Sequence, residues 1–503
     1  MIELTARPAR TSFSGPEKQL KKMFRCLRVK DKSSYWRQRY ALKRVGYFSD
    51  VQDPDERNKK IEQLKESTRW IKFYDRRSDT FATGLLGRVK RFLLKKGIKF
   101  SVTDHRQKIP QFKKVTKFHF EDKVETRPEQ LEAVNAALQR GRGIIHMATN
   151  AGKTECACAI IVEYYRQTQQ VPRVLFLAHR VGLVQQTADR FRKHLPDSVR
   201  IVTLGGGEKS IPKERAILVA TVQTASNLLS RLDFERFQEK CDILYIDELH
   251  INKAWQCSHI VNQNEAPMRF SLSGTVDKEN KIKMLHYVGM TGPIIAETKN
   301  KELVDLGRSA KPIIRFLEVN SEEIPKRSGF AAGYRLGIVQ NEIRNEMVIK
   351  ETLRYLEKDY KTLVTVSRIS HGMRLKRMFE KEIDLPVEFL SGSTPMDIRK
   401  RVIQRFEKGK IGVLIGSQIF DTGVDIPSIA AWVAAGGGLG WELVLQRLGR
   451  VLRRKEGENK VYISDFVDLH NRYLMKHSLA RMRHYQNEKI ADISIVTKEK
   501  KSV

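Results

Sequence analysis

The chain has 503 residues, of which 41% are apolar, and a formal net charge of +34 at pH 7. This length exceeds one ordinary hydrophobic core and indicates about three globular domains. No run of about 18 apolar residues occurs, which argues against a membrane span, and the start MIELTARPARTSF has no apolar signal segment, so we expect a cytoplasmic protein.

Residues 1–120 concentrate the positive charge, with 32 Lys and Arg against 12 Asp and Glu. Such density favours a polyanionic partner, and nucleic acid is the commonest one. A disordered cationic tail is the alternative, but apolar residues are interleaved. RWIKFYD (69–75) alternates like a strand, and TGLLGRVKRFLLKKG (83–97) has helical spacing before a glycine. We therefore predict a small basic α+β domain that binds DNA.

From about residue 121 the pattern changes to alternating strands and helices, which is typical of parallel sheets covered by helices. We predict two α/β units, residues 121–310 and residues 311–503, the second ending in helices. The expected strands of the first unit are GIIHMAT, RVLFLAH, RAILVAT and DILYID. Those of the second are PIIRFLEV, TLVTVS, VEFLSG, GVLIGS and AAWVAAGG. FVDLHNRYLMKHSLARMRHYQNEK spaces Phe466, Leu469, Tyr473, Leu479, Met482 and Tyr485 as the apolar face of one or two helices.

MATNAGKT (147–154) lies between an expected strand and an expected helix, which is the setting of a phosphate-binding loop. Met147 stands where the usual pattern has its first glycine. The residues expected to face the nucleotide are Asn150, Ala151, Gly152, Lys153 and Thr154. Lys153 would supply a positive charge to the β and γ phosphates, and the Thr154 hydroxyl would be a magnesium ligand.

LYIDELH (244–250) ends an apolar run with two adjacent carboxylates. A strand-end acid suits a magnesium ion beside a triphosphate, so we assign Asp247 as a metal ligand. Glu248 would orient or deprotonate the attacking water. His250 either links the nucleotide state to the rest of the enzyme or makes a local hydrogen bond. A turn with exposed acids is the alternative interpretation of the pair.

QRLGRVLRR (446–454) places Gln446, Arg450 and Arg453 at i, i+4 and i+7, so a helix would carry them on one face. Arginines from a second domain stabilise a transferring phosphate when two domains close. A basic helix face without such a role is the alternative, and it fits Arg447 and Arg454 better.

Taken together, residues 125–470 resemble a superfamily-two helicase, because the family's motifs occur in the family's order. These stretches are TRPEQ, MATNAGKT, FLAHRVGLVQQT, LGGGE, ATVQT, DELH, SLSGT, TVSRISHG, GSQIFDTGVDIP and QRLGRVLRR. Gly274 departs from the usual Ser-Ala-Thr motif. The resemblance implies two tandem RecA-like motor domains that use ATP and Mg²⁺.

The same resemblance assigns roles to individual residues. It implies that Gln130 reads adenine, that Gly423 and Asp425 contact the nucleotide, and that Arg450 and Arg453 are the catalytic arginines. The residues that it implies for nucleic-acid contact are Arg180, Gly205, Gly206, Gly207, Thr221, Gln223, Ser367, Arg368 and Ser417.

Within that superfamily the chain resembles the bacteriophage UvsW-type branch-migration helicases. RWIKFYDRRSDTFATGLLGRVKRFL (69–93), LSGTVDKENKIKMLHYVGMTGPI (272–294) and ISDFVDLHNRYLMKHSLARMRHYQNEK (463–489) carry this likeness. It implies a monomer that remodels forks, Holliday junctions and displacement loops, with branched duplex and single-stranded DNA as partners and no membrane. An RNA–DNA hybrid stays open as a further partner. Arg69, Lys72 and Arg88 are then candidates to hold a duplex arm, and Trp70 belongs to the core or stacks at a junction.

Three other functions compete with this interpretation. The first is a motor that translocates on duplex without separating strands, and the second is an RNA helicase with the same motor. The third is an ATP-gated clamp with degenerate motifs, which Met147 and Asn150 favour but the intact Lys153, Asp247 and Glu248 oppose.

Overall fold

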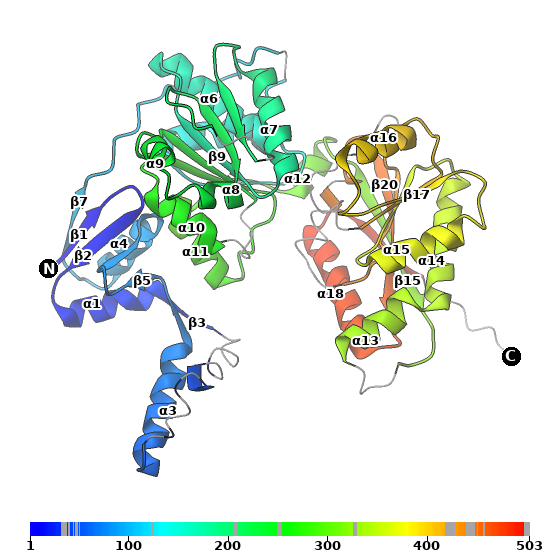
Figure 1. Cartoon of the computed structure of the whole chain (residues 1–503), viewed down its shortest axis with the longest axis horizontal. Coiled ribbons are helices and arrows are strands. Elements are labelled where there is room, and N and C mark those ends of the chain that lie inside the picture. The colour runs from blue at the N-terminus through cyan, green and yellow to red at the C-terminus, as the bar shows by residue number, and fades with distance from the viewer. Residues whose placement is uncertain are drawn as a thin grey trace. The chain divides into compact units, whose positions relative to one another are not determined.

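The computed structural model describes residues 1–31, 38, 41–43, 45, 49, 51–122, 125–205, 210–248, 254–324, 329–417, 426, 428–438, 448–449, 451–455 and 458–496. The chain forms two compact units (Figure 1). The first comprises Met1–Met147 with Gly152–Glu297, and the second comprises Ala148–Ala151 with Thr298–Val503. The domain borders after residues 120 and 310 remain predictions.

The amino-terminal part of the first unit is a small mixed sheet with helices, as expected of an α+β domain. Its strand order is β5-β6-β2-β1-β7, with β1 antiparallel to β2 and parallel to β7. The strands are β1 Ile2–Ala6, β2 Arg10–Ser14, β5 Tyr74–Asp75, β6 Thr80–Ala82 and β7 Phe100–Asp104. The helices are α1 Glu17–Met23, η1 Phe24–Leu27, α3 Pro54–Thr68, η3 Thr83–Leu85 and α4 Leu86–Lys95.

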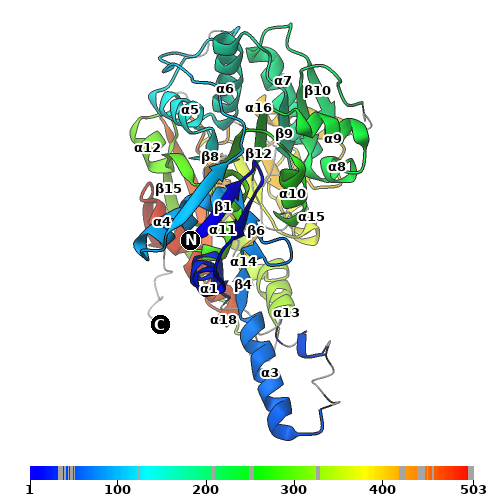
Figure 2. The ribbon, with the colours of Figure 1, turned by 90° about the vertical axis from the view of Figure 1, so that its left-hand side faces the viewer.

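Two further strands, β3 Arg28–Lys30 and β4 Trp70–Lys72, pair antiparallel at the base of α3. Helix α3 begins with Pro54 after Asp53, whose carboxylate accepts a hydrogen bond from the Asp55 amide at 2.9 Å. It projects away from the five-stranded sheet (Figures 1 and 2). No described residue of α3 is fully buried, so this helix is a polar extension of the domain.

The rest of the first unit is a seven-stranded sheet of order β10-β11-β9-β12-β13-β8-β14 with helices packed around it. The registered strand pairs are parallel, and the sequence-predicted strands are confirmed. The strands are β8 Arg142–Met147, β9 Val174–Ala178, β10 Ile201–Leu204, β11 Ile217–Thr221, β12 Ile243–Asp247, β13 Met268–Ser273 and β14 Ile294–Thr298. The helices are α5 Pro128–Arg140, α6 Lys153–Thr168, α7 Val181–His194, α8 Val222–Asn227, α9 Leu232–Glu239, α10 Ala254–Gln263 and α11 Lys281–Thr291.

Helix α11 joins the amino-terminal domain to this sheet. Leu285 and Val288 of α11 pack into the core of the amino-terminal domain, and the ring of Phe73 meets that of His286 at 4.8 Å. Gly84 in η3 lies so close to α11 that a Cβ atom there would stand 1.8 Å from the Val288 carbonyl oxygen. The two parts of the unit therefore touch backbone to backbone.

The second unit contains another seven-stranded sheet, of order β17-β18-β16-β19-β20-β15-β21, whose registered pairs are all parallel. The strands are β15 Lys311–Val319, β16 Thr362–Thr365, β17 Val387–Leu390, β18 Val413–Gly416, β19 Ala431–Val433, β20 Lys460–Asp468 and β21 Asp492–Val496. The helices are α12 Asn300–Asp305, α13 Phe330–Tyr334, α14 Glu342–Leu356, α15 Ile369–Phe379, α16 Met396–Glu407 and α18 Arg472–Glu488. Two RecA-like α/β sheets preceded by a small mixed domain confirm the predicted fold class.

The carboxy-terminal helix differs from the sequence-based expectation. Phe466 lies in β20, Leu469 lies between β20 and α18, and Leu479 is 40% exposed. The buried residues of α18 are Leu474, Ser478, Arg481 and Tyr485. Counting only apolar residues predicted part of the buried face, since Tyr485 is buried and Met482 packs against the core. It missed Arg481, which is paired with a strand aspartate as described below.

Among the described residues, no helix combines the length and hydropathy needed to cross a bilayer. Nor do the His, Cys, Asp and Glu residues in that part of the chain form a group of three or more that could hold a metal ion.

Candidate functional site

The phosphate loop connects β8 to α6 and has the backbone that such a loop needs. Asn150 has φ +74° and Gly152 has φ +86°, and Gly152 caps the start of α6. The Ala151 amide donates to the Ala148 carbonyl at 3.1 Å, which closes the turn. A Cβ atom at position 152 would stand 2.0 Å from Nε2 of Gln130. The backbone conformation therefore favours glycine here, and a larger residue would also displace the Gln130 side chain.

Lys153 and Thr154 open helix α6, as predicted. The Lys153 ammonium donates to the Met147 carbonyl at 3.2 Å, so the side chain folds back over its own loop. The Met147 side chain is buried in the core, and only its carbonyl takes part in the loop, where it accepts from Lys153. The departure from glycine at this position leaves the loop geometry intact.

Asp247 ends β12 and Glu248 follows it in a left-handed conformation, with φ +49°. The Glu248 amide donates to the Leu272 carbonyl of β13 at 3.0 Å, which fixes this turn at the sheet edge. Burial and the neighbouring Glu248 carboxylate raise the pKa of Asp247 to about 7, while Lys153 opposes the shift. A carboxylate that is costly to ionise by itself is suited to a site where a cation joins it.

The side chains and amides of the phosphate loop and of the β12 end are of the kinds that bind a nucleotide and a metal ion. The Oε2 atom of Glu248 is buried without a hydrogen-bond partner among the described residues. Buried polar atoms are nearly always satisfied, so an orphaned carboxylate oxygen points to water or ligand. The amides of the loop and of the helix start, with Lys153, are donors for phosphate. The carboxylates are acceptors for a metal ion and a water.

Four predicted nucleic-acid contacts of the first unit lie after β9, β10 and β11. Arg180 is exposed and precedes α7, and Gly205 has φ +134°. A Cβ atom at position 205 would lie 3.4 Å from Thr221 and 3.7 Å from Val181. Thr221 caps α8 through the Thr224 amide at 3.0 Å, and exposed Gln223 bonds Asn227 and Gln256. The structure therefore brings Arg180, Gly205, Thr221 and Gln223 to one edge of the sheet.

In the second unit, Ser367 and Arg368 follow β16 and Ser417 follows β18, again at the carboxyl ends of adjacent strands. Arg368 is exposed, and Ser417 is buried with its amide bonded to the Leu390 carbonyl at 3.0 Å. Arg453 departs from the expected helix face. It forms an isolated bridge with Ser309 instead, because the helical backbone does not extend beyond Val451.

Several predicted residues lie outside the described part of the chain, and their assignments stay predictions. They are Gly206, Gly207, His250, Gly423, Asp425, Gln446 and Arg450.

Three basic residues and one tryptophan on β3 and β4 form a surface near α3 that we call the basic ribbon. Its residues are Arg28, Lys30, Trp70 and Lys72. In the β3–β4 register, Arg28 faces Lys72 and Lys30 faces Trp70, whereas Val29 faces Ile71. Val29 packs against the domain core, so alternation turns the other four side chains outward. The Arg28 guanidinium lies 4.6 Å from the Trp70 ring centroid. Arg28 and Lys72 are like charges opposite each other, which is unfavourable without an anion nearby. The Glu66 carboxylate, which accepts from Trp70 Nε1 at 3.0 Å and interacts with Arg28 and Lys30, supplies one negative charge.

The other two predicted basic contacts have structural partners. Arg69 pairs with Glu66 at 3.0 Å, and Arg88 Nε donates to the Cys26 carbonyl at 2.8 Å. Sequence analysis missed Arg28 and Lys30. The RVK triplet alternates as WIK does, but three residues are too few to predict that the two segments pair.

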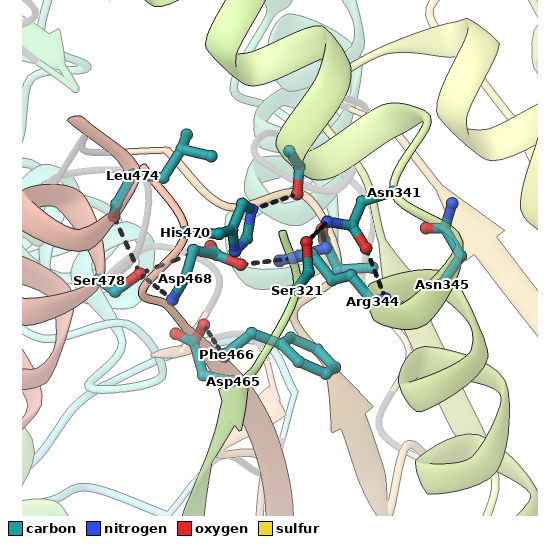
Figure 3. Close-up of polar contacts among 12 residues, drawn as sticks. Ser321, Asn341, Arg344, Asn345, Asp465, Phe466, Asp468, His470, Leu474 and Ser478 are labelled. Atoms are coloured by element: carbon teal, nitrogen blue, oxygen red, sulfur yellow. Dashed lines mark hydrogen bonds and ion pairs between the residues drawn. The ribbon is translucent and has the colours of Figure 1, made fainter. Parts of the chain in front are cut away.

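Sequence analysis also missed a buried polar network at the carboxyl end of β20 (Figure 3). Arg344 of α14 donates to Asp468 at 2.7 Å, and Arg481 of α18 donates to Asp465 at 2.9 Å. Neither arginine is more than 3% exposed. The available signal was the pair of acids in the apolar run ISDFVD, because buried carboxylates need cationic partners.

Comparison with protein families agrees with this architecture. Residues 123–278 match the family described as type III restriction enzyme, res subunit, and residues 344–455 match the helicase conserved C-terminal domain. The first match includes the phosphate loop with Asp247 and Glu248, and the second includes Ser367, Arg368 and the segment that carries the predicted catalytic arginines.

Individual proteins are also similar. The ATP-dependent DNA helicase uvsW of Enterobacteria phage T4 is 25% identical over 439 residues, covering 81% of this chain and 86% of that protein. The DNA 3'-5' translocase XPB2 of Sulfurisphaera tokodaii is 27% identical over 373 residues, covering 67% and 80%.

Among solved structures, the type ISP restriction-modification enzyme LlaBIII has a TM-score of 0.57 at 12% identity, covering 83% of this chain and 34% of that chain. A type I restriction HsdR fragment of Vibrio vulnificus has a TM-score of 0.54 at 20% identity, covering 73% and 68%. These likenesses support the fold. The matched families, the relatives above and the ordered motifs place the chain among the superfamily-two helicases, as an ATP-hydrolysing enzyme.

Proposed function

We propose that this helicase acts on DNA and remodels branched substrates, namely forks, Holliday junctions and displacement loops, by unwinding and branch migration in replication, recombination and repair. The basic ribbon carries this proposal. It gives the motor a second, sequence-independent phosphate-binding surface, and docking on α11 holds that domain against the first motor sheet. A branched substrate offers two arms, and such an enzyme can hold one while it moves along the other.

Similarity to the T4 helicase supports the same proposal. Residues 123–503 make up about three quarters of the chain, so a match that covers 81% includes part of the amino-terminal domain. A generic motor would be matched only over its two α/β units. The added domain is the part that distinguishes substrates in this proposal.

The chemistry follows from the site residues. Lys153 and the amides at the start of α6 would hold the phosphates, and Thr154 and Asp247 would hold a magnesium ion, which when bound would neutralise charge on the reacting phosphates. Glu248 orients the attacking water and accepts its proton at Oε2, the carboxylate oxygen without a described partner. We assign Gln446, Arg450 and Arg453 to stabilising the transferring phosphate, and Gln130 to contacting the base.

A duplex translocase that does not separate strands is the second candidate. It is favoured by the 27% identity to a protein named as a DNA translocase. This alternative uses the same ATP site and differs only in what the motor does at a fork.

Steady-state ATP hydrolysis tests both candidates. Equal nucleotide amounts of linear duplex, single strand, forked DNA, four-way junction and RNA are compared, and strand release is followed on the branched substrates. We expect the fork and the junction to stimulate hydrolysis most strongly, with strands released. Equal stimulation by linear duplex without strand release establishes the translocase, and preferential stimulation by RNA overturns the DNA assignment.

A further inference from the structure

The turn Ala435–Gly438, directly after β19, is held by side chains from three different helices. The Ala435 carbonyl accepts from Arg344 of α14 at 2.6 Å, and the Gly438 carbonyl accepts from Arg481 of α18 at 2.8 Å. Between them, the Gly436 carbonyl accepts a hydrogen bond from the Tyr334 hydroxyl of α13. Charge-assisted hydrogen bonds inside a protein are the strong ones, so the two arginines pin both ends of the turn.

Those arginines have a purely structural explanation. Each is paired with an aspartate of β20, Arg344 with Asp468 and Arg481 with Asp465 (Figure 3 shows Asp465 and the Arg344 side of this network). The Arg344 guanidinium also lies 4.7 Å from the Phe466 ring centroid. Removing either partner leaves a buried unpaired charge, which costs several kcal/mol. These four side chains therefore hold the fold of the turn.

Tyr334 is different, because it also meets predicted nucleic-acid contacts. The guanidinium of Arg368 lies over the Tyr334 ring at 5.9 Å. Gly436, which accepts the hydroxyl bond, is packed on Ser367, and a Cβ atom there would stand 2.7 Å from the Ser367 hydroxyl oxygen. Directly after Tyr334 the helix continues as a π-helix, η5 Arg335–Val339. Such helices are uncommon and are frequent at functional sites.

We propose that Tyr334 is a positioning residue that couples nucleic-acid binding at Ser367 and Arg368 to the Ala435–Gly438 turn. In the sequence this turn is eight residues ahead of Gln446, the first residue of the predicted catalytic segment. When Arg368 binds a nucleic-acid phosphate, its guanidinium moves relative to the Tyr334 ring. The hydrogen bond from the Tyr334 hydroxyl transmits this movement to the Gly436 carbonyl. The inference rests on the proposed function, since it requires that nucleic acid stimulates ATP hydrolysis.

The test is the variant Tyr334→Phe, which keeps the ring under Arg368 and removes only the hydroxyl. One hydrogen bond of this kind corresponds to about a three- to tenfold effect. We expect stimulated ATP hydrolysis on forked DNA to fall by that factor, while hydrolysis without DNA and the Kd for the fork stay at wild-type values. Tyr334→Leu also removes the ring and should in addition weaken binding of the fork.

The matched control is Tyr355→Phe. Tyr355 is a buried tyrosine of the same unit, and its hydroxyl bonds Ser464 at 2.8 Å without touching the turn. This variant should keep full stimulation. Wild-type stimulation in Tyr334→Phe, or an equal loss in both variants, overturns the coupling role and leaves the proposed function standing. A wild-type enzyme that no nucleic acid stimulates overturns both.

Discussion

Gly152 of the phosphate loop lies directly against the side-chain amide of Gln130, leaving no space for a Cβ atom between them. The residue expected to read adenine therefore also supports the loop that is expected to hold the phosphates. The residues expected to recognise the base and the phosphates are therefore in direct contact in the first unit.

The variant Gly152→Ala tests that contact. An alanine would need φ +86° and would push Gln130 away. Left-handed backbone costs on the order of 1–3 kcal/mol, so we expect about 5- to 150-fold weaker nucleotide binding, measured with a fluorescent ATP analogue. Gly87→Ala is the control, because no atom lies within 4 Å of its Cβ position in α4. Unchanged binding by Gly152→Ala contradicts the assignment of this loop.

Glu248→Gln separates binding from chemistry. The amide keeps the size of the side chain but cannot accept the proton of the attacking water, so hydrolysis should fall about 10²- to 10⁴-fold. ATP and DNA should still bind, and the protein should stall on its substrate. Lys153→Ala provides the comparison, because it should lose hydrolysis and also weaken ATP binding. Normal turnover by Glu248→Gln would show that another group activates the water.

Lys72→Ala tests the basic ribbon. Each phosphate contact contributes about 0.9 to the slope of log K against log salt concentration. We expect the slope measured with forked DNA to decrease by that amount. Lys90→Ala, at an exposed lysine of α4 in the same domain, makes the same charge change and should leave the slope unaltered. Equal slopes for both variants would remove the ribbon from the interface.

Deletion of residues 1–120 is a less specific test of the same role. We expect it to reduce junction binding and to spare basal hydrolysis. Because Leu285 and Val288 of α11 belong to the core of the amino-terminal domain, the deletion also exposes apolar surface on the motor. Point variants of the ribbon avoid that effect.

His371 gives the second unit a defined dependence on pH. It is fully buried with Nε2 bonded to Asn345 at 2.9 Å, and burial, with Arg344 and Arg374 nearby, lowers its pKa to about 3. Below about pH 6.5 the His371 imidazole is protonated in the unfolded chain but stays neutral in the native state. Stability is therefore lost as pH falls from about 6.5 to 3, by about 1.4 kcal/mol between pH 7.5 and 5.5.

Urea denaturation at these two pH values checks this effect. The variant His371→Gln should show a correspondingly smaller loss of stability at pH 5.5 than the wild type. If the two proteins lose stability in parallel, His371 is protonated in the native state.

The sequence predicted the two parallel sheets well, because buried strands such as RVLFLAH and DILYID are short apolar runs at regular spacing. It also placed the phosphate loop and Asp247 and Glu248 at strand ends, where parallel strands present their carboxyl ends together. These features depend on local pattern and order along the chain.

Long-range pairs were not predictable in the same way. Arg344 and Asp468 are 124 positions apart and meet only after the sheet has formed. The burial of Arg481 in α18 was likewise not expected, since a periodicity argument assigns charged residues to solvent. Arg28 and Lys30 joined Lys72 through strand pairing, and a three-residue strand carries too little periodicity to reveal a partner.

Gly84 has a consequence for how this enzyme can be taken apart or rebuilt. Two backbones in direct contact leave no side chain by which another sequence could adjust the fit. The amino-terminal domain is therefore no interchangeable module. A chimera that carries it on a different motor needs a helix that the backbone can approach as closely, and a small residue at position 289, where an added Cβ atom would stand 3.3 Å from the Ala82 Cβ. Because no side chain stands between Gly84 and the Val288 carbonyl, a force on the amino-terminal domain acts directly on the backbone of α11.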